Sequence, residues 1–164
     1  MTGTLRGDRD GRQYGLIEGY ACVFGEMDLG RDIVERGAFA QTLSARGPAG
    51  VRLLYQHDPA EPIGVWDEIG EDARGLFVRG RLSLEVRRAR EVQSLVAEGA
   101  LDGLSIGFKA VRARTDPKSR VRRLLSIDLW EVSVVTFPMQ PGARIATPLL
   151  PRTARTLHDA AFRA

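Results

Sequence analysis

Two histidines, one cysteine and a small number of well-placed serines and carboxylates limit the chemistry available to this chain. Attack by a serine needs a hydroxyl, an imidazole that takes its proton, and a third group that fixes the tautomer of the imidazole. His57 follows a predicted apolar strand at 51–56, at its polar end, whereas His158 lies in the C-terminal segment. A strand-end histidine is often only a surface or capping residue, so position alone makes His57 a candidate and no more.

Ser105 is the candidate nucleophile. It lies in Gly103-Leu104-Ser105-Ile106-Gly107, after a predicted helix and at the start of an apolar strand. Glycines two positions away on each side permit close approach of a substrate backbone. The pattern also matches the nucleophile elbow of α/β-hydrolases, with Asp128 and His158 in the right chain order. An elbow joins a strand to a following helix, whereas here the helix comes first, so we set this alternative aside.

Glu131 is the third candidate, because it interrupts the apolar run 129–135. A carboxylate buried without a partner is costly, so we expect Glu131 to have a partner or to lie on a wet face. Strict alternation along a strand puts Glu131 on the same face as Leu129 and Ser133, opposite Trp130. The sequence therefore predicts a polar face on this strand.

Proximity of Ser105 and Glu131 depends on how the predicted strands 104–114 and 120–137 pair. They are joined by the turn-rich segment 115–119 and form a hairpin. A hairpin centred on Lys118 places Ser105 directly across from Glu131. A shift of one residue would place the two side chains on opposite faces of the sheet.

The remaining pattern is that of a strand-dominated domain with two helices. The expected helices cover 38–45 and 85–98. The other expected strands are 15–24, 32–35, 51–56, 63–69, 76–84 and a short one at 144–148. This order favours a closed barrel or a curled sheet over a parallel βαβ stack. We expect a flexible lead-in at 1–14, one domain at 15–150 and a tail at 151–164.

Composition is that of an ordinary globular domain, with 43% hydrophobic and 27% charged residues and a formal net charge of +3. No apolar run approaches the roughly 18 residues that span a bilayer, and the first 15 residues lack the apolar stretch of a signal peptide. The single cysteine, Cys22, excludes an internal disulfide, suits a reducing cytoplasm and is expected to be a small buried hydrophobe.

Two other functions fit parts of the sequence. Arginines concentrate in the predicted hairpin at 112–123, which would suit a non-catalytic assembly or nucleic-acid-binding module. No aromatic residues interleave with them, and a solvated hairpin tip explains the same residues, so nucleic acid is not the expected partner. A metal hydrolase built on His57, Asp58 and Glu61 is the other alternative, although one histidine with two carboxylates is a poor zinc set.

Seven short blocks, in this order and at this spacing, resemble the HK97-type phage prohead proteases over about residues 15 to 147. They are Gly19-Tyr20-Ala21, Gly37-Ala38-Phe39, Leu53-Leu54-Tyr55-Gln56-His57-Asp58, Pro62-Ile63-Gly64, Arg74-Gly75-Leu76, Leu104-Ser105-Ile106-Gly107-Phe108 and Trp130-Glu131-Val132-Ser133-Val134-Val135-Thr136-Phe137-Pro138.

The resemblance implies both a fold and a function. The family is distantly related to the herpesvirus assemblin-type serine proteases, which implies an α+β domain that is mainly β, with flanking helices. The expected barrel is closed or partly closed and has about six to seven strands. The implied role is a serine endopeptidase that acts in the immature capsid, in the host cytoplasm. It would remove the scaffolding segment of the major capsid protein and often process itself, with no cofactor, metal or membrane. A homodimer is a further expectation, and within this family the non-catalytic alternative built on the hairpin at 112–123 would be a capsid-assembly module.

The resemblance also assigns roles. His57 and Ser105 match the catalytic histidine and serine of the family, and Glu131 is the candidate third member. Assemblin-like relatives use a second histidine as third member, and this chain has none at that point, which keeps Asp58 and Asp128 as alternatives. By analogy, backbone N–H groups of Met139 and Gln140 are candidate oxyanion donors, although their loop, 138–143, departs from the commoner Pro-Ala-Asn-Pro form.

Overall fold

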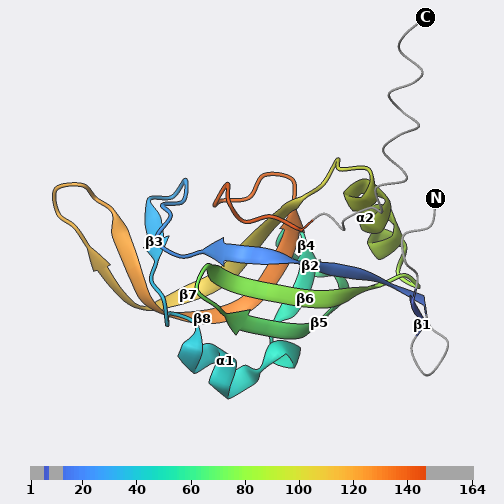
Figure 1. Cartoon of the computed structure of the whole chain (residues 1–164), viewed down its shortest axis with the longest axis horizontal. Helices are drawn as coiled ribbons and strands as arrows, with labels where there is room; N and C mark the ends of the chain where they lie inside the picture. The colour runs from blue at the N-terminus through green and yellow to red at the C-terminus, as the bar shows by residue number, and fades with distance from the viewer. Residues whose placement is uncertain (1–5, 8–12, 147–164) are drawn as a thin grey trace, which may run out of the picture.

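A computed structural model describes residues 6–7 and 13–146, which form eight strands and two α-helices (Figure 1). The strands are β1 (Arg6–Gly7), β2 (Gln13–Val23), β3 (Asp32–Val34), β4 (Arg52–Tyr55), β5 (Asp58–Glu71), β6 (Gly75–Ser83), β7 (Gly103–Thr115) and β8 (Arg122–Val135). The helices are α1 (Ala40–Arg46) and α2 (Arg87–Ala97), and a 3-10 turn covers Pro48–Gly50.

Most of the expected elements are present at the expected places. The clearest difference is β5, which begins at Asp58, directly after His57, and not at the expected residue 63. Its two prolines, Pro59 and Pro62, are tolerated in the strand because they lie where its pairing with β4 is irregular. The expected strand at 144–148 is wrong as far as the description reaches: Arg144 and Ile145 form only isolated bridges. Residues 147–148 and the expected tail at 151–164 lie outside the described residues.

The strands form one sheet in the order β1-β2-β6-β5-β4-β8-β3, with β7 paired to β8. β3 and β4 run parallel to β8, and the other neighbours are antiparallel. The mainly β architecture with flanking helices agrees with the prediction, but the sheet is not closed. Within the described residues no strand ladder joins β2 to β7. Arg144 and Ile145 make single bridges to Gly103 on β7 and Gly19 on β2.

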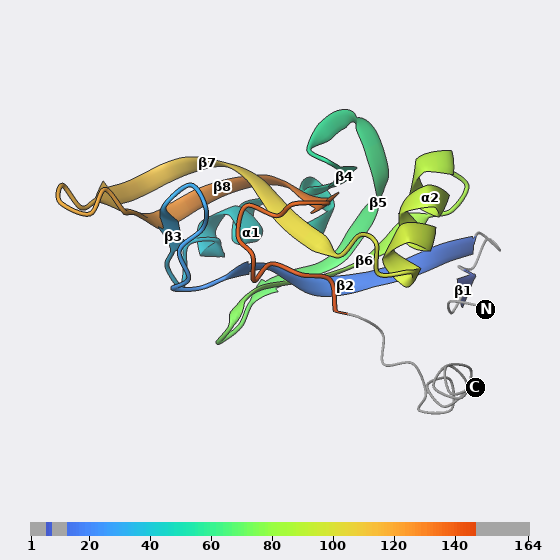
Figure 2. The same ribbon diagram turned by 90° about the horizontal axis from the view of Figure 1, so that it is seen from above.

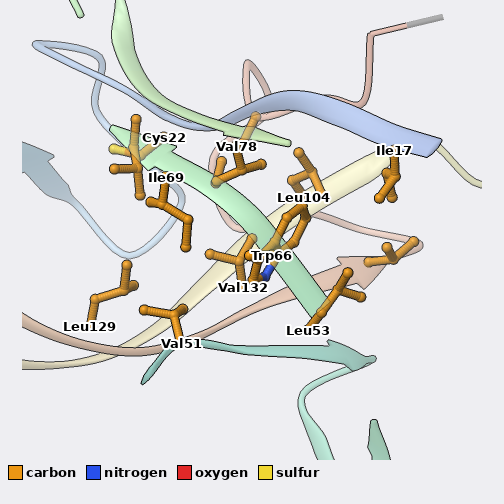
Figure 3. Packing of buried hydrophobic residues seen from close by; sticks show 14 of the residues in the cluster. Ile17, Cys22, Val51, Leu53, Trp66, Ile69, Val78, Leu104, Leu129 and Val132 are labelled. Carbon is orange, nitrogen blue, oxygen red and sulfur yellow. The ribbon is translucent and has the colours of Figure 1, made fainter. Parts of the chain in front are cut away.

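One hydrophobic core fills the concave side of the curled sheet (Figure 3). β6 shows why these residues form a strand: Leu76, Val78 and Leu82 alternate with more exposed positions and are at most 2% exposed. α2 adds Ala89 and Val92, one turn apart on its buried face. Neither helix among the described residues is long and apolar enough to cross a membrane.

The β7–β8 hairpin extends beyond the rest of the sheet as an arm, defined here as residues 111–121, at the end of the molecule opposite α2 (Figures 1 and 2). Residues 111–120 are all exposed. The base of the arm is tied to β3 and its C-terminal flank, where Arg122 makes a bidentate pair with Asp32 (2.8 and 2.5 Å) and Arg123 binds Glu35 (2.5 Å).

Candidate active site

Three adjacent strands carry the predicted site residues. β8 lies between β7 and β4, so it receives Ser105 from one side and the end of β4 from the other. In the ladders, Ser105 and Leu54 both pair with Ser133, and Gly107 pairs with Glu131. Ser105 therefore faces Ser133 rather than Glu131. The predicted register is off by two residues, which leaves Ser105 and Glu131 on the same face.

His57 and Glu131 form a direct pair. His57 Nδ1 lies 2.5 Å from Glu131 Oε1. A carboxylate oxygen accepts hydrogen bonds, so Nδ1–H is the donor and Nε2 of the neutral ring keeps its lone pair. The Glu131 side chain is 12% exposed, which agrees with the expectation that a carboxylate in this strand has a partner. The pair has the geometry of an oriented imidazole base.

The pKa of His57 is raised above its ordinary value. The hydrogen bond to Glu131 is the main cause, partial burial of the ring opposes it, and the charge of Glu131 adds to the increase. The carboxylate thus stabilises the protonated imidazole, which is the form of the ring after it has accepted a proton.

A strained two-residue turn presents His57. Gln56 and His57 join β4 to β5 with φ values of 54° and 59°, a left-handed conformation that costs non-glycine residues roughly 1–2 kcal/mol each. Gln56 N–H donates to Val134 O (2.9 Å), and the Gln56 amide donates to Thr136 Oγ1 (2.6 Å). Residues held against a conformational preference in this way cluster at functional sites.

A β-bulge sets the face of Glu131. The ladder passes from Gly107 opposite Glu131 to Phe108 opposite Leu129, so Trp130 is an extra residue. Leu129 is fully buried in the core with Val132, and Trp130 is 50% exposed. The prediction that Leu129 shares a face with Glu131 is therefore wrong, because one extra residue reverses the alternation. The prediction that Ser133 shares that face is consistent with its bond to Glu131.

Other parts of the same chain pack closely against the glycines around Ser105. A Cβ on Gly107 would lie 2.0 Å from Glu131 Oε1, so only glycine leaves space for this carboxylate. A Cβ on Gly103 would meet Val135 O at 2.5 Å and Pro138 Cδ at 2.9 Å. Both glycines thus lie against other parts of the chain, and their expected role in admitting a substrate backbone stays a prediction.

Ser105 lines a small cavity of about 50 Å³ together with Met139 and Gln140. Ser105 is 6% exposed, and its hydroxyl has no hydrogen-bond partner within the described part of the chain. The N–H groups of Met139 and Gln140 likewise have no acceptor there. The side-chain amide of Gln140 is used structurally: it accepts from Val23 N–H (2.6 Å) and donates to Val23 O (2.9 Å). This clamp fixes the loop beside Ser105.

The alternative third members bind elsewhere. Asp58 Oδ1 accepts from Ala60 N–H at 2.8 Å, which caps the start of β5. Asp128 pairs with Arg46 (2.7 Å) through one oxygen and accepts from the Trp130 indole N–H (2.8 Å) through the other. The structure thus brings Glu131 to His57 and gives both aspartates other partners.

The other predicted chemistries find less support. Among residues 6–7 and 13–146, no group of three or more His, Cys, Asp or Glu side chains could hold a metal ion. Glu61, from the metal alternative, lies 3.5 Å from Arg88. Burial raises the pKa of Cys22 to about 12, which agrees with its prediction as a buried hydrophobe. His158 lies outside the described residues.

A hydroxyl, an imidazole and a carboxylate on neighbouring strands invite comparison with known hydrolases. The sequence model of the caudovirus prohead serine proteases matches residues 4–158, nearly the whole chain. The chain belongs to this family. The predicted resemblance to prohead proteases is thereby confirmed.

Relatives in other phages carry the same name. The prohead protease of Enterobacteria phage HK97 is 37% identical over 142 residues, which cover 84% of this chain and 61% of that protein. The prohead protease of Escherichia phage T5 is 30% identical over 126 residues, 74% of this chain and 57% of that protein. The chain thus spans about three fifths of the length of these relatives.

Two solved structures share the fold. The bacteriophage T4 capsid assembly protease has a TM-score of 0.65 at 12% identity, covering 82% of this chain and 89% of that one. The KSHV protease in complex with a hexapeptide phosphonate inhibitor has a TM-score of 0.52 at 15% identity, covering 80% and 63%. These likenesses place the open sheet among herpesvirus-protease-like folds.

Proposed function

We propose that this prohead protease family member is a serine endopeptidase with Ser105 as nucleophile, His57 as base and Glu131 as the group that orients His57. The observation that carries the proposal is the His57 Nδ1 to Glu131 Oε1 hydrogen bond of 2.5 Å, made beside the strand that holds Ser105. This bond leaves Nε2 of the ring as the basic nitrogen.

The proposed reaction is acyl transfer through a covalent intermediate. His57 Nε2 removes the proton from Ser105 Oγ, which bonds to the carbonyl carbon of the scissile peptide. The resulting tetrahedral intermediate collapses, and the amine leaves with the proton from His57. A water molecule, deprotonated by His57, then cleaves the acyl ester and regenerates Ser105.

The N–H groups of Met139 and Gln140 are proposed as donors to the oxyanion. Their residues share a cavity with Ser105, and their N–H groups have no other acceptor among the described residues. One such donor typically contributes about 2.7–4 kcal/mol of transition-state stabilisation. The Gln140 amide clamp on Val23 holds the loop that carries them.

The proposed substrate is the scaffolding segment of the major capsid protein, and also the protease itself, inside the immature capsid in the host cytoplasm. Family membership supports this assignment. A capsid polyprotein of Pseudomonas phage PAJU2 is 32% identical over 103 residues, which cover 59% of this chain and 15% of that polyprotein. A segment similar to this chain therefore occurs within a longer protein that is named a capsid polyprotein.

Co-expression with the major capsid protein of the same phage tests the proposal, with masses of the products as the readout. We expect the wild-type chain to shorten the capsid precursor and Ser105→Ala to leave it intact while remaining folded. The matched control is Ser83→Ala, an exposed serine at the end of β6, which is expected to cleave like wild type. Cleavage by Ser105→Ala at the wild-type rate would show that Ser105 is not the nucleophile.

A further inference from the structure

Ser133 connects both partners of the His57–Glu131 pair. Its hydroxyl donates to Glu131 Oε2 at 2.6 Å and accepts from the backbone N–H of His57 at 3.1 Å. The residue is 0% exposed, so water does not compete for these bonds. One buried hydroxyl therefore joins the carboxylate to the main chain of the turn that presents the imidazole.

The bond to Glu131 fixes the direction of its carboxylate. One oxygen, Oε1, lies at His57 Nδ1, and the other, Oε2, is held by Ser133. Gly107 lies against the same carboxylate, because a Cβ added there would lie 2.0 Å from Oε1. With both oxygens engaged, the carboxylate has one orientation available relative to the ring.

The bond to His57 fixes the backbone of the turn. Both residues of the turn have positive φ, so its conformation needs support from the surrounding structure. Val134 supports Gln56, and the Ser133 hydroxyl is the acceptor for His57 N–H within the described residues. The two anchors are consecutive residues of β8, the strand that also carries Glu131.

We propose that Ser133 is a positioning residue for catalysis: it fixes the carboxylate of Glu131 and the turn of His57 in one arrangement. The inference rests on the proposed function, because it concerns the same site. Other charged side chains near the pair on the neighbouring strands are engaged elsewhere: Arg52 donates to Ala49 O, and Asp58 accepts from Ala60 N–H.

Kinetics of Ser133→Ala provide the first test. We expect kcat to fall roughly 10- to 100-fold, as for a small misplacement of reacting groups, while KM stays within about twofold. Ser133→Thr keeps a hydroxyl on a strand-compatible side chain and is expected to retain more turnover than Ser133→Ala. Ser126→Ala, on the same strand without these bonds, serves as the matched control. Wild-type kcat in Ser133→Ala would overturn the inference.

Titration of the His57 ring by NMR gives a readout that does not need cleavage. The measurement is made in the Ser105→Ala background, and His57→Gln assigns the resonance because the chain has two histidines. We expect Ser133→Ala to lower the pKa of His57, since the carboxylate is no longer held against Nδ1. A loss of stability with an unchanged pKa would reduce Ser133 to a structural residue and overturn the inference.

The two tests separate the positioning role from the proposed function. If the wild-type chain does not cleave but the His57 titration shifts in Ser133→Ala, the proposed function fails and the catalytic role of Ser133 fails with it, although Ser133 still holds Glu131 against His57. If the wild-type chain cleaves and Ser133→Ala matches it in both measurements, only the positioning role fails. Should Ser133→Ala not fold, Ser133→Cys carries the same expectations, because a thiol of similar size is a poor hydrogen-bonding group.

Discussion

In the proposed mechanism, the hydrogen bond and the charge of Glu131 together determine the pH range in which His57 would act as a base. Its hydrogen bond and charge raise the pKa of His57, so the ring becomes neutral only at higher pH than an ordinary histidine. Glu131→Gln removes the charge, and we expect the acid limb of the kcat/KM profile to move to lower pH. Turnover should also fall by roughly 10²- to 10⁴-fold, because an amide can favour the wrong tautomer of the ring.

The profile would be recorded from about pH 5 to 9, which brackets the titration of a histidine. Asp128→Asn is the matched control, since Asp128 binds Arg46 and Trp130 rather than His57. Its acid limb should coincide with that of the wild type. An unchanged profile in Glu131→Gln would remove Glu131 from the site and return Asp58 and Asp128 to consideration.

The sequence identifies the candidate catalytic groups more readily than the side chains that hydrogen-bond to them. His57 and Glu131 stand out because histidine is scarce and a carboxylate is out of place in an apolar strand. Ser133 does not stand out, because a serine between valines is compatible with an ordinary buried position. Only the structure reveals that its hydroxyl lies between two other residues of the site. The Glu-x-Ser spacing, which places both on one face, is the signal that could have found it.

The bulge at Trp130 in β8 determines which face of the strand carries Glu131, and the candidate site depends on it. It lets β8 bury both Leu129 and Val132 while Glu131 stays on the face of His57. The backbone of Leu129 is satisfied from α1 rather than from a strand: its N–H donates to Thr42 Oγ1 (3.2 Å), and its carbonyl accepts from Arg46 (3.1 Å). α1 thus covers the irregular part of β8 between its parallel partners β3 and β4.

Deleting Trp130 should therefore damage the protein far more than truncating its side chain. Without the extra residue, either Leu129 leaves the core or Glu131 points into it. We expect the deletion to lower the free energy of unfolding by about 2–5 kcal/mol, as for the loss of a buried leucine. Trp130→Ala keeps the bulge and loses a half-exposed side chain, so it should stay within about 1 kcal/mol of wild type.

Urea unfolding of both variants, with the NMR titration of His57, checks this expectation. The deletion should bring the pKa of His57 back toward its ordinary value, while Trp130→Ala should leave it raised. Equal stabilities and equal titrations in the two variants would show that the bulge does not set the face of Glu131.

Element positions follow from local sequence, whereas their partners do not. Apolar periodicity and the turn residues predict β2, β6 and α2 to within a few residues, because those signals are local. The parallel pairing of β4 with β8 joins residues about 80 positions apart, as in Leu54 with Ser133, and periodicity contains no information about it. The same holds for the bulge, because strict alternation is the default for a strand.

The molecule has two distinct parts, the curled sheet that contains the candidate site and the exposed arm that extends from it. The site lies where β4, β8 and β7 meet, and the arm extends away from it along the same hairpin (Figure 2). Four basic side chains in the arm make no ion pair within the described residues: Arg112, Arg114, Lys118 and Arg120. Asp116 is used to cap the turn, where it accepts from the N–H groups of Lys118 and Ser119.

Replacing these four residues together by glutamine tests whether the arm has a function of its own. Glutamine keeps the length and solubility of the side chains and removes their charge, while Arg122 and Arg123 still tie the hairpin to Asp32 and Glu35. If the arm is a solvated hairpin tip, the variant should cut both a short peptide and the capsid precursor within about twofold of wild type, since surface substitutions away from a site have small effects.

If the arm docks an acidic partner, cleavage of the precursor should fall while the peptide is still cut. If it binds nucleic acid, wild-type affinity should fall steeply with salt and the variant should lose that dependence. Either of the last two results would show that the arm is a binding surface and not a solvated tip. The geometry around His57 does not predict such a surface.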